Sequence, residues 1–194
     1  NSTQYGYDAS GNRITMNDPE GTVTRYEHDD VGRLTAVVEN YLISQSPDYQ
    51  TNVRTEYAYD ASGNLVRVQN ALGYTAVFTY DLAGRQVAAE DPLGNVTRYA
   101  YDGHGRRVGE FYPDSSGPIT VTTSYNALGW PTQIQYPAVG EVPGFTVEYD
   151  YTPLGYRAAI TDATGVTSFD YDALYQPLAS AAPEGEAQYR CNAA

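Results

Sequence analysis

The sequence contains no lysine and only one cysteine. All 11 basic residues are therefore arginines, and against 24 acidic residues they leave a formal net charge of −13. Because nucleic-acid phosphates are bound by basic surfaces, this balance excludes a nucleic-acid-binding protein. Cys191 has no second cysteine with which to pair, so no disulfide forms within the chain.

Long apolar runs are also missing. No stretch approaches the roughly 20 apolar residues that a membrane-spanning helix needs, so we expect no transmembrane segment. The first residues lack the basic and apolar segments of a secretory signal peptide. The chain begins at Asn1 inside a half-repeat of the pattern described next, and we expect it to be part of a longer chain. At 194 residues it is long enough to bury a hydrophobic core.

Tyrosine is abundant, with 20 residues, and it marks an internal repeat. The clearest copy, YAYDASGN at residues 57–64, has two aromatic positions followed by Asp, two further residues and Gly. The second aromatic positions of eight successive copies are 21, 31, 21, 21, 24, 26 and 20 residues apart. A period of this length predicts a repeat architecture.

Each repeat contains two turn signals. In the clearest copy these are Asp60 to Gly63 and Asn70 to Gly73, with six or seven residues between one turn and the next. The first turn residue accepts hydrogen bonds from the backbone that follows, and Gly supplies the positive φ of a three-residue hairpin loop with a bulge. Short strands joined in this way predict an all-β fold, a repetitive antiparallel meander of β-hairpins.

The aromatic residues are predicted to share one face of this sheet, because side chains two residues apart in a strand point the same way. The first aromatic positions form one row: Tyr5, Tyr26, Tyr57, Phe78, Tyr99, Tyr149 and Phe169. The second positions form another: Tyr7, His28, Tyr59, Tyr80, Tyr101, Tyr125, Tyr151 and Tyr171. Since tyrosine combines an apolar ring with a polar hydroxyl, these rows suit a broad, half-wet surface.

The pattern predicts one array of about eight units over residues 1–186. Longer loops are expected near residues 37–55 and 137–147, where no short turn signal occurs. Tyr175 replaces the expected Gly of the last copy, so that turn is expected to differ or to be strained. Residues 187–194 continue no pattern and are expected to fray.

The residues expected to build the repeat are the second aromatic residue, the first turn residue and the turn glycine of each copy. They are Tyr7, Asp8, Gly11, Asp29, Gly32, Tyr59, Asp60, Gly63, Tyr80, Asp81, Gly84, Tyr101, Asp102, Gly105, Tyr125, Gly129, Tyr151, Gly155, Tyr171 and Asp172.

This motif, Tyr-x-Tyr-Asp-x-x-Gly-[Asn/Arg] at about 21-residue spacing over residues 5–186, resembles the YD repeat of the Rhs family. That family includes bacterial Rhs toxins, C-type subunits of insecticidal toxin complexes, wall-associated bacterial proteins and animal teneurins. The resemblance implies hairpins that spiral into a hollow β-shell or solenoid, which in the toxins encloses a cytotoxic segment. It implies wall material here, and no toxin activity of its own.

Two functions are therefore expected to compete. The first is a non-catalytic segment of a β-shell that encloses and protects a toxin or other polypeptide cargo. The alternative is a secreted or wall-associated surface array for adhesion, carbohydrate binding or extracellular structure. Both imply a secreted or cell-surface location. The expected partners are the rest of the shell or neighbouring copies through strand edges, an enclosed cargo, or surface glycans. A bacterial source is expected from the resemblance.

Candidate chemical sites are few. His28 occupies a tyrosine position and His104 lies in a turn, and neither has catalytic or metal-binding partners at a defined spacing. The turns Asp8 to Asn12 and Asp60 to Asn64 resemble a calcium loop but offer one carboxylate each, too few for calcium. Turn chemistry therefore explains them better. We expect no enzyme, metal or cofactor.

Two further groups have mainly structural interpretations. Arg33, Arg85 and Arg106 follow the turn glycine directly and are expected to pair with a nearby Asp, with an anion site as the weaker alternative. Asn1 and Asn95 begin glycosylation sequons, which matter only in a eukaryotic secretory setting.

Overall fold

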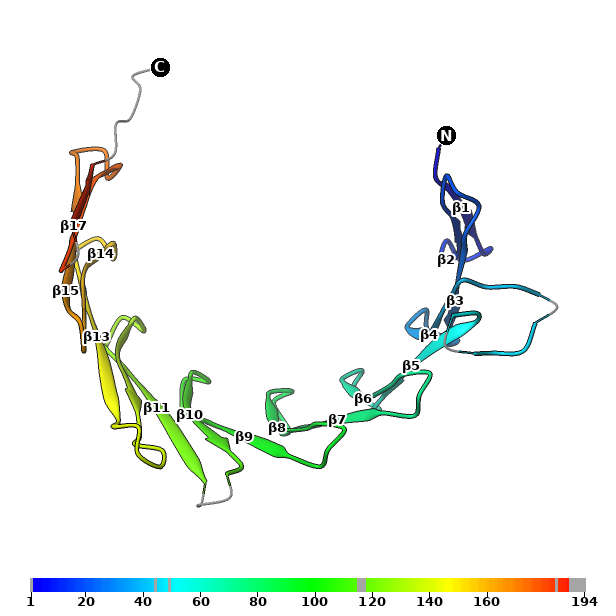
Figure 1. Cartoon of the computed structure of the whole chain (residues 1–194), viewed down its shortest axis with the longest axis horizontal. Helices are drawn as coiled ribbons and strands as arrows, with labels where there is room; N and C mark the ends of the chain where they lie inside the picture. Colours follow the sequence, from blue (N-terminus) through cyan, green and yellow to red (C-terminus); the bar gives the residue numbers. More distant parts are fainter. Residues whose placement is uncertain (1, 44, 49, 115–117, 184, 189–194) are drawn as a thin grey trace. The chain divides into compact units, whose positions relative to one another are not determined.

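The computed structural model describes residues 2–43, 45–48, 50–114, 118–183 and 185–188, and all its regular elements are β-strands. The expected all-β hairpin meander is confirmed (Figure 1). The strands are β1 (Gln4–Tyr7), β2 (Arg13–Asn17), β3 (Val23–His28), β4 (Leu34–Glu39), β5 (Val53–Tyr59), β6 (Leu65–Gln69), β7 (Thr75–Tyr80), β8 (Gln86–Glu90), β9 (Val96–Tyr101), β10 (Arg107–Tyr112), β11 (Ile119–Tyr125), β12 (Pro131–Tyr136), β13 (Phe145–Tyr151), β14 (Arg157–Asp162), β15 (Gly165–Tyr171), β16 (Pro177–Ala182) and β17 (Gly185–Gln188).

The chain divides into two compact units, Asn1–Val96 and Thr97–Ala194. In the first, β1 to β8 pair antiparallel, each with the next strand in the sequence. In the second, β9 to β17 follow the same rule. Each repeat is thus one up-and-down pair of strands, as the alternation of turn signals predicts.

The two kinds of turn give hairpins with different registers. We call the turn that follows the second aromatic residue the Tyr-Asp turn. All eight hairpins closed by a Tyr-Asp turn contain a register shift at the second aromatic residue; in the third, Tyr59 pairs with Leu65 and Ala58 pairs with Arg67. The described pairings across the other turns contain no shift. Each shift is a β-bulge, which interrupts the ladder beside the turn.

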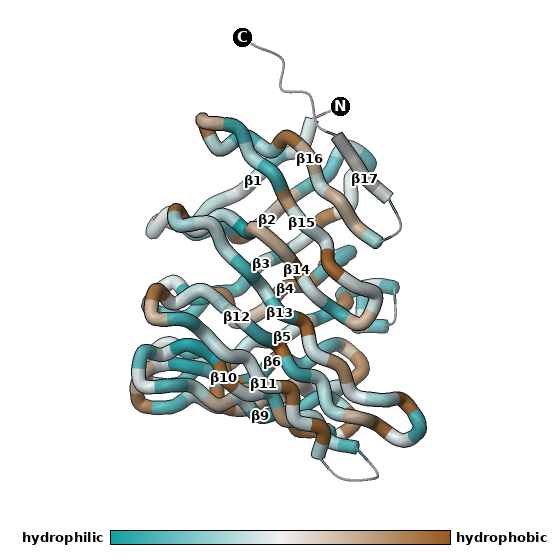
Figure 2. Tube along the Cα trace, turned by 90° about the vertical axis from the view of Figure 1, so that its left-hand side faces the viewer, coloured by the Kyte–Doolittle hydropathy of each residue, from teal (hydrophilic) through white to brown (hydrophobic). Residues whose placement is uncertain are grey.

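The sheet has two different faces. Tyr57 pairs with Val68, which pairs with Ala76. The first aromatic position of this repeat therefore lies beside small and aliphatic side chains on the same face. The opposite face is more polar: Glu56 pairs with Gln69 there. Figure 2 shows apolar residues dispersed along the strands and at several turns, with polar residues between them.

The chain is long enough for a hydrophobic core, but its described residues form only a very small one. Among the described residues only Ala36 and Val38 form a buried apolar core, at 0% and 5% exposure, and both lie in β4. Most strand residues are half-buried on both faces. Each unit is a single layer of sheet within the described residues, whereas a conventional domain packs a second layer against the first.

Longer connections occur in both regions where short turn signals are missing. The first is narrower than the range expected from the sequence, because β4 extends to Glu39 and β5 begins at Val53. Its buried Asn52 adopts φ 54° and accepts a hydrogen bond from the Leu42 backbone N–H, while its amide donates to the Gln45 carbonyl. Residues 137–144 form the second connection, closed by an isolated bridge between Val139 and Val142.

The last turn keeps the geometry of the others despite its missing glycine. Tyr175 takes the left-handed conformation, with φ 58°, and its N–H donates to the Asp172 carbonyl at 3.0 Å. The turn therefore does not differ, and the non-glycine residue is held where glycine is favoured. Residues 187 and 188 belong to β17, and the rest of the tail expected to fray lies outside the described residues.

Candidate functional site

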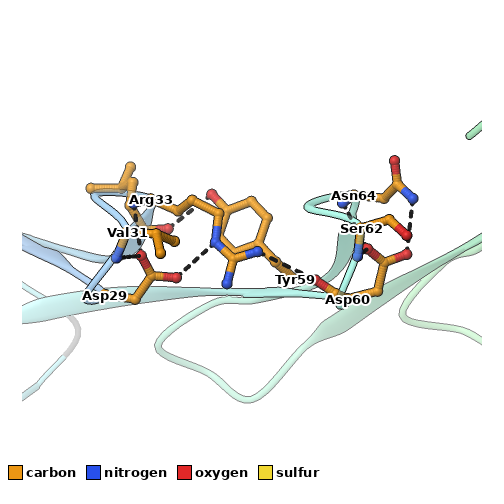
Figure 3. A network of polar contacts seen from close by, with 8 residues as sticks. Asp29, Val31, Arg33, Tyr59, Asp60, Ser62 and Asn64 are labelled. Atoms are coloured by element: carbon orange, nitrogen blue, oxygen red, sulfur yellow. Dashed lines mark hydrogen bonds and ion pairs between the residues drawn. The ribbon is translucent and has the colours of Figure 1, made fainter.

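The Tyr-Asp turn is built around one carboxylate. In the third copy, Asp60 Oδ1 accepts hydrogen bonds from the backbone N–H groups of Ser62 and Asn64, at 2.9 and 2.8 Å. Its Oδ2 accepts a third from the Asn64 amide at 2.9 Å (Figure 3). Gly63 completes the turn with φ 89° and donates to the Asp60 carbonyl. The aspartate thus satisfies donors that the hairpin ladder leaves free.

These hydrogen bonds favour the charged carboxylate. In Asp60, the Asn64 side chain followed by the Asn64 backbone N–H holds the pKa below its ordinary value. At Asp102 the Arg106 side chain contributes most, followed by the Arg106 backbone N–H, and the pKa falls to about 2. Ionised turn carboxylates are therefore part of the folded structure at neutral pH.

In five hairpins the second aromatic residue is a tyrosine that joins the hairpin to the one before it. Tyr59, on β5, donates its hydroxyl hydrogen to the carbonyl of Leu34, the first residue of β4, at 2.9 Å. Leu34 lies beside the bulge, where the ladder is interrupted. The same bond recurs from Tyr80 to Leu65, Tyr125 to Arg107, Tyr151 to Pro131 and Tyr171 to Arg157, at 2.7–2.9 Å.

In all five cases the accepting carbonyl belongs to the second residue after the glycine of the preceding Tyr-Asp turn. We call this arrangement, a tyrosine hydroxyl on that carbonyl, the hairpin junction. It explains an asymmetry in the sequence: the first aromatic row contains Phe78 and Phe169, whereas the second row contains no phenylalanine. A phenylalanine in the second row would lack the hydroxyl.

At four junctions the residue directly after the turn glycine covers the tyrosine ring of the junction. Arg33 places its guanidinium carbon 4.9 Å from the centroid of the Tyr59 ring. Arg106 does the same over Tyr125 at 4.8 Å. Trp130 replaces the cation with an indole, 5.2 Å from the Tyr151 ring, and Tyr156 lies 5.4 Å from Tyr171. We call these four residues the cover residues.

The arginine covers also link two successive turns. Arg33 Nε donates to Asp29 Oδ2 at 2.7 Å, and its Nη1 donates to the Asp60 carbonyl at 3.3 Å (Figure 3). Arg106 connects Asp102 to the Asn126 carbonyl in the same way. The ion pairs expected for these arginines are present, as is the one between Arg85 and Asp81.

The residues expected to build the repeat lie together along one edge of each unit. All the expected turn glycines have φ between 76° and 89°. Every expected turn aspartate donates its backbone N–H to the carbonyl four residues on. Tyr7 differs from the other tyrosines of its row, because it lies on β1 and is 59% exposed. Tyr101 also interacts with its surroundings and is not without a partner.

The two histidines have different surroundings. His104 lies in its turn and donates its backbone N–H to Asp102 Oδ1. His28 occupies a tyrosine position of the second row, and its Nδ1 is buried without a hydrogen-bond partner in the described structure. The described residues contain no cluster of three or more His, Cys, Asp or Glu side chains that could hold a metal ion. Nor do they contain a helix able to cross a membrane.

Sequence reasoning missed an ion cluster on the polar face. Arg54 on β5 donates to both carboxylate oxygens of Glu27, at 3.0 and 2.8 Å, and to Glu56 at 2.9 Å. The Arg54 side chain holds the pKa of Glu27 below its ordinary value. The cluster spans β3 to β5 beside the buried Ala36, which pairs with both glutamates. Its only signal was the alternation of Arg54 and Glu56 in one strand.

This chain is similar to one protein family and to several solved structures. The family model described as RHS Repeat matches residues 7–40, 59–91 and 80–116. No curated protein matches the chain. Among solved structures, "Crystal Structure of TcdB2-TccC3-Cdc42" is 15% identical with a TM-score of 0.43. A Tc holotoxin pore from Photorhabdus luminescens is 17% identical with a TM-score of 0.37. Each alignment covers 93% of this chain but only 13% and 12% of the other, so this chain spans about an eighth of their length.

Proposed function

Since this chain belongs to the Rhs family of YD-repeat proteins, we propose that it is a non-catalytic wall segment of a β-shell that encloses and protects a polypeptide cargo. The shell is proposed to be a secreted or cell-surface structure. The observation that carries the proposal is the hairpin junction, which recurs with one geometry in both units.

The junction suits a wall because it does not depend on a core. A single layer of sheet exposes both faces, so burial of apolar surface stabilises it less than a packed domain. Tyrosine hydroxyls and cover residues instead join each hairpin to its neighbour at the edge. Repeats that contact only their neighbours can be extended to any length, as in other repeat architectures. Such a sheet can separate two spaces.

A non-catalytic role is part of the proposal. Paired-acid hydrolysis needs two carboxylates facing one substrate bond. Here the turn carboxylates accept two or three hydrogen bonds from their own turns, as at Asp8 and Asp60. Activity of the chain in a broad hydrolase screen, lost on replacing a named pair of carboxylates, would contradict this part.

The proposed partners are neighbouring YD-repeat segments joined through strand edges, and the cargo. β1 has one pairing partner among the described strands, β2, and carries Tyr5 and Tyr7, which are 51% and 59% exposed. Unpaired strand edges favour pairing with a further strand. We propose that a preceding hairpin of the same type completes this edge.

Limited proteolysis of the full-length natural protein tests the wall function. The wild-type protein is expected to yield a protected fragment that is not part of the repeat array. A double variant, Tyr59→Ala with Tyr151→Ala, breaks one junction in each unit and is expected to lose this protection. Tyr57→Phe with Phe169→Tyr is the matched control, because it changes the first aromatic row only. A wild-type digest without any protected fragment would refute encapsulation.

Adhesion to surface glycans is the second candidate, favoured by the half-exposed tyrosine side chains on one face. Tyrosine rings stack on sugars through their apolar faces. Binding on a glycan array, lost in Tyr80→Ala without loss of folding, would support this candidate. Variants at Tyr80 or Tyr101 that change stability alone would argue against it.

A further inference from the structure

One junction in the first unit lacks its tyrosine. His28 stands where the other hairpins have the second tyrosine, and the carbonyl that such a tyrosine would reach belongs to Arg13, two residues after Gly11. No side chain of the described residues donates to the Arg13 carbonyl. Imidazole is shorter than a phenol and carries no hydroxyl. His28 therefore cannot form the hydroxyl–carbonyl hydrogen bond of the other junctions.

The structure contains an open pocket at this position, with a volume of about 400 Å³. Its lining consists of Tyr7, Gly11, Arg13, Tyr26, His28 and Leu34. These residues come from both hairpins, including the turn glycine and the accepting residue of the first. The buried Nδ1 of His28 has no hydrogen-bond partner among the described residues. A buried polar atom without a partner costs free energy, and a ligand recovers part of that cost when the imidazole turns this atom toward the pocket.

We propose that this pocket binds a small neutral phenol. Five junctions of this chain show how a phenol binds beside a Tyr-Asp turn, with its hydroxyl on the bulge carbonyl at 2.7–2.9 Å. A phenol at the first junction has a donor for the Arg13 carbonyl and an acceptor for an imidazole N–H. The Tyr7 and Leu34 side chains supply apolar surface for its ring, while the Tyr26 ring is already covered by Arg13, whose guanidinium carbon lies 4.3 Å from its centroid.

Charges of both signs lie around the pocket: Arg13 is part of its lining, and aspartates lie in a neighbouring pocket. His28 and Tyr26 also line a second pocket of about 730 Å³, which includes Asp8, Asp29 and Asp30. Hydrogen bonds hold the pKa values of Asp8 and Asp29 below their ordinary value, so both are charged at neutral pH. These aspartates repel an anionic ligand whereas Arg13 attracts one, so the ligand is identified by its ring and hydroxyl and not by its charge. Binding of a phenol at this pocket does not depend on the wall function, and the two proposals are tested separately.

Titration of the chain with p-cresol, followed by NMR, tests the proposal. For a ligand of this size we expect a Kd on the order of 1 mM. Because the chain has two histidines, their ring signals report the site directly. The His28 ring signals are expected to shift and those of His104 to stay unchanged. Toluene, which lacks the hydroxyl, is expected to bind at least about 5-fold more weakly.

Two matched variants complete the test. His28→Tyr supplies the missing phenol from the chain itself, so it is expected to raise the melting temperature and to weaken p-cresol binding at least about 10-fold. His104→Tyr makes the same exchange in a turn and is expected to leave binding unchanged. Undiminished binding to His28→Tyr, equal binding of toluene, or shifts at both histidines would overturn the proposal. If His28→Tyr failed to fold, the wild-type ring signals would still decide it.

Discussion

Two regions of this chain close the same junction with different chemistry. At Tyr59 and Tyr125 an arginine covers the ring and links two turns through its guanidinium. At Tyr151 and Tyr171 the cover is aromatic, Trp130 or Tyr156, with ring centroids 5.2 and 5.4 Å apart. The hydroxyl bond to the bulge carbonyl is the same in all four.

The comparison shows which part of the junction is constant. Asn64 occupies the cover position before Tyr80, yet the Tyr80 hydroxyl still donates to the Leu65 carbonyl at 2.9 Å. The hydroxyl therefore defines the junction, and the cover determines how the ring is shielded from water. A cationic cover should respond to salt, whereas an aromatic cover should not.

The largest effect is expected from removing the aromatic cover. Trp130→Ala deletes a large half-buried ring that contacts Tyr151, and we expect a loss of about 2 kcal/mol in the free energy of unfolding. Urea unfolding followed by circular dichroism measures it. Arg33→Ala is the comparison, with an expected loss of about 1 kcal/mol. Equal losses would show that the two covers contribute alike.

Removing one hydroxyl should have the next largest effect. Tyr59→Phe leaves the Leu34 carbonyl without its donor and is expected to cost about 1 kcal/mol. Tyr57→Phe removes a hydroxyl from the first row, where phenylalanine occurs naturally, and should cost about 0–0.3 kcal/mol. Thermal unfolding of the two variants under one condition separates them. If both lost the same stability, the hydroxyl bond would not define the junction.

Salt should separate the two kinds of cover by a smaller amount. The Arg33 and Asp29 side chains are partly exposed, so screening at about 1 M NaCl should reduce the cost of Arg33→Gln by about 0.3–0.5 kcal/mol. Trp130→Phe changes no charge, and its cost should be unaffected by salt. Urea titrations of both variants at low and high salt give the two differences. If the stability lost in Arg33→Gln did not change with salt, the Arg33 cover would act through packing of its aliphatic chain and not through its charge.

The smallest effect is expected for Asp102→Asn, because Asn begins the equivalent turn at residue 126 and still accepts from the backbone. The folded pKa of Asp102 is lowered to about 2 from 3.8, so its contribution is complete above pH 4 and is lost as the pH falls toward 2. The variant should therefore lose less stability than the wild type between pH 4 and 2. Melting temperatures across this range test it, with Asp150→Asn in strand β13 as the control outside the turns. An unchanged slope would contradict the prediction.

The positions of turns and strands could be predicted from the sequence, because they depend on residues three or four apart. Asp60 and Gly63 determine their turn locally, and the strand between two turns follows. The extent of the hydrophobic core could not be predicted from chain length. Length permits a core, but only a second layer creates one, and the described residues of each unit form a single layer. The ion cluster at Arg54 was missed because its glutamates lie on two strands.

The sequence by itself determined the repeat, its turn chemistry and the face on which the aromatic rows lie. Tertiary structure alone decided which carbonyl each tyrosine reaches, because that bond joins residues 14 to 25 apart in sequence and depends on the bulge and on the register between hairpins. It also decided that arginine, tryptophan and tyrosine serve one cover position. Aromatic rings and guanidinium groups belong to different residue types, but each can pack against a phenol ring.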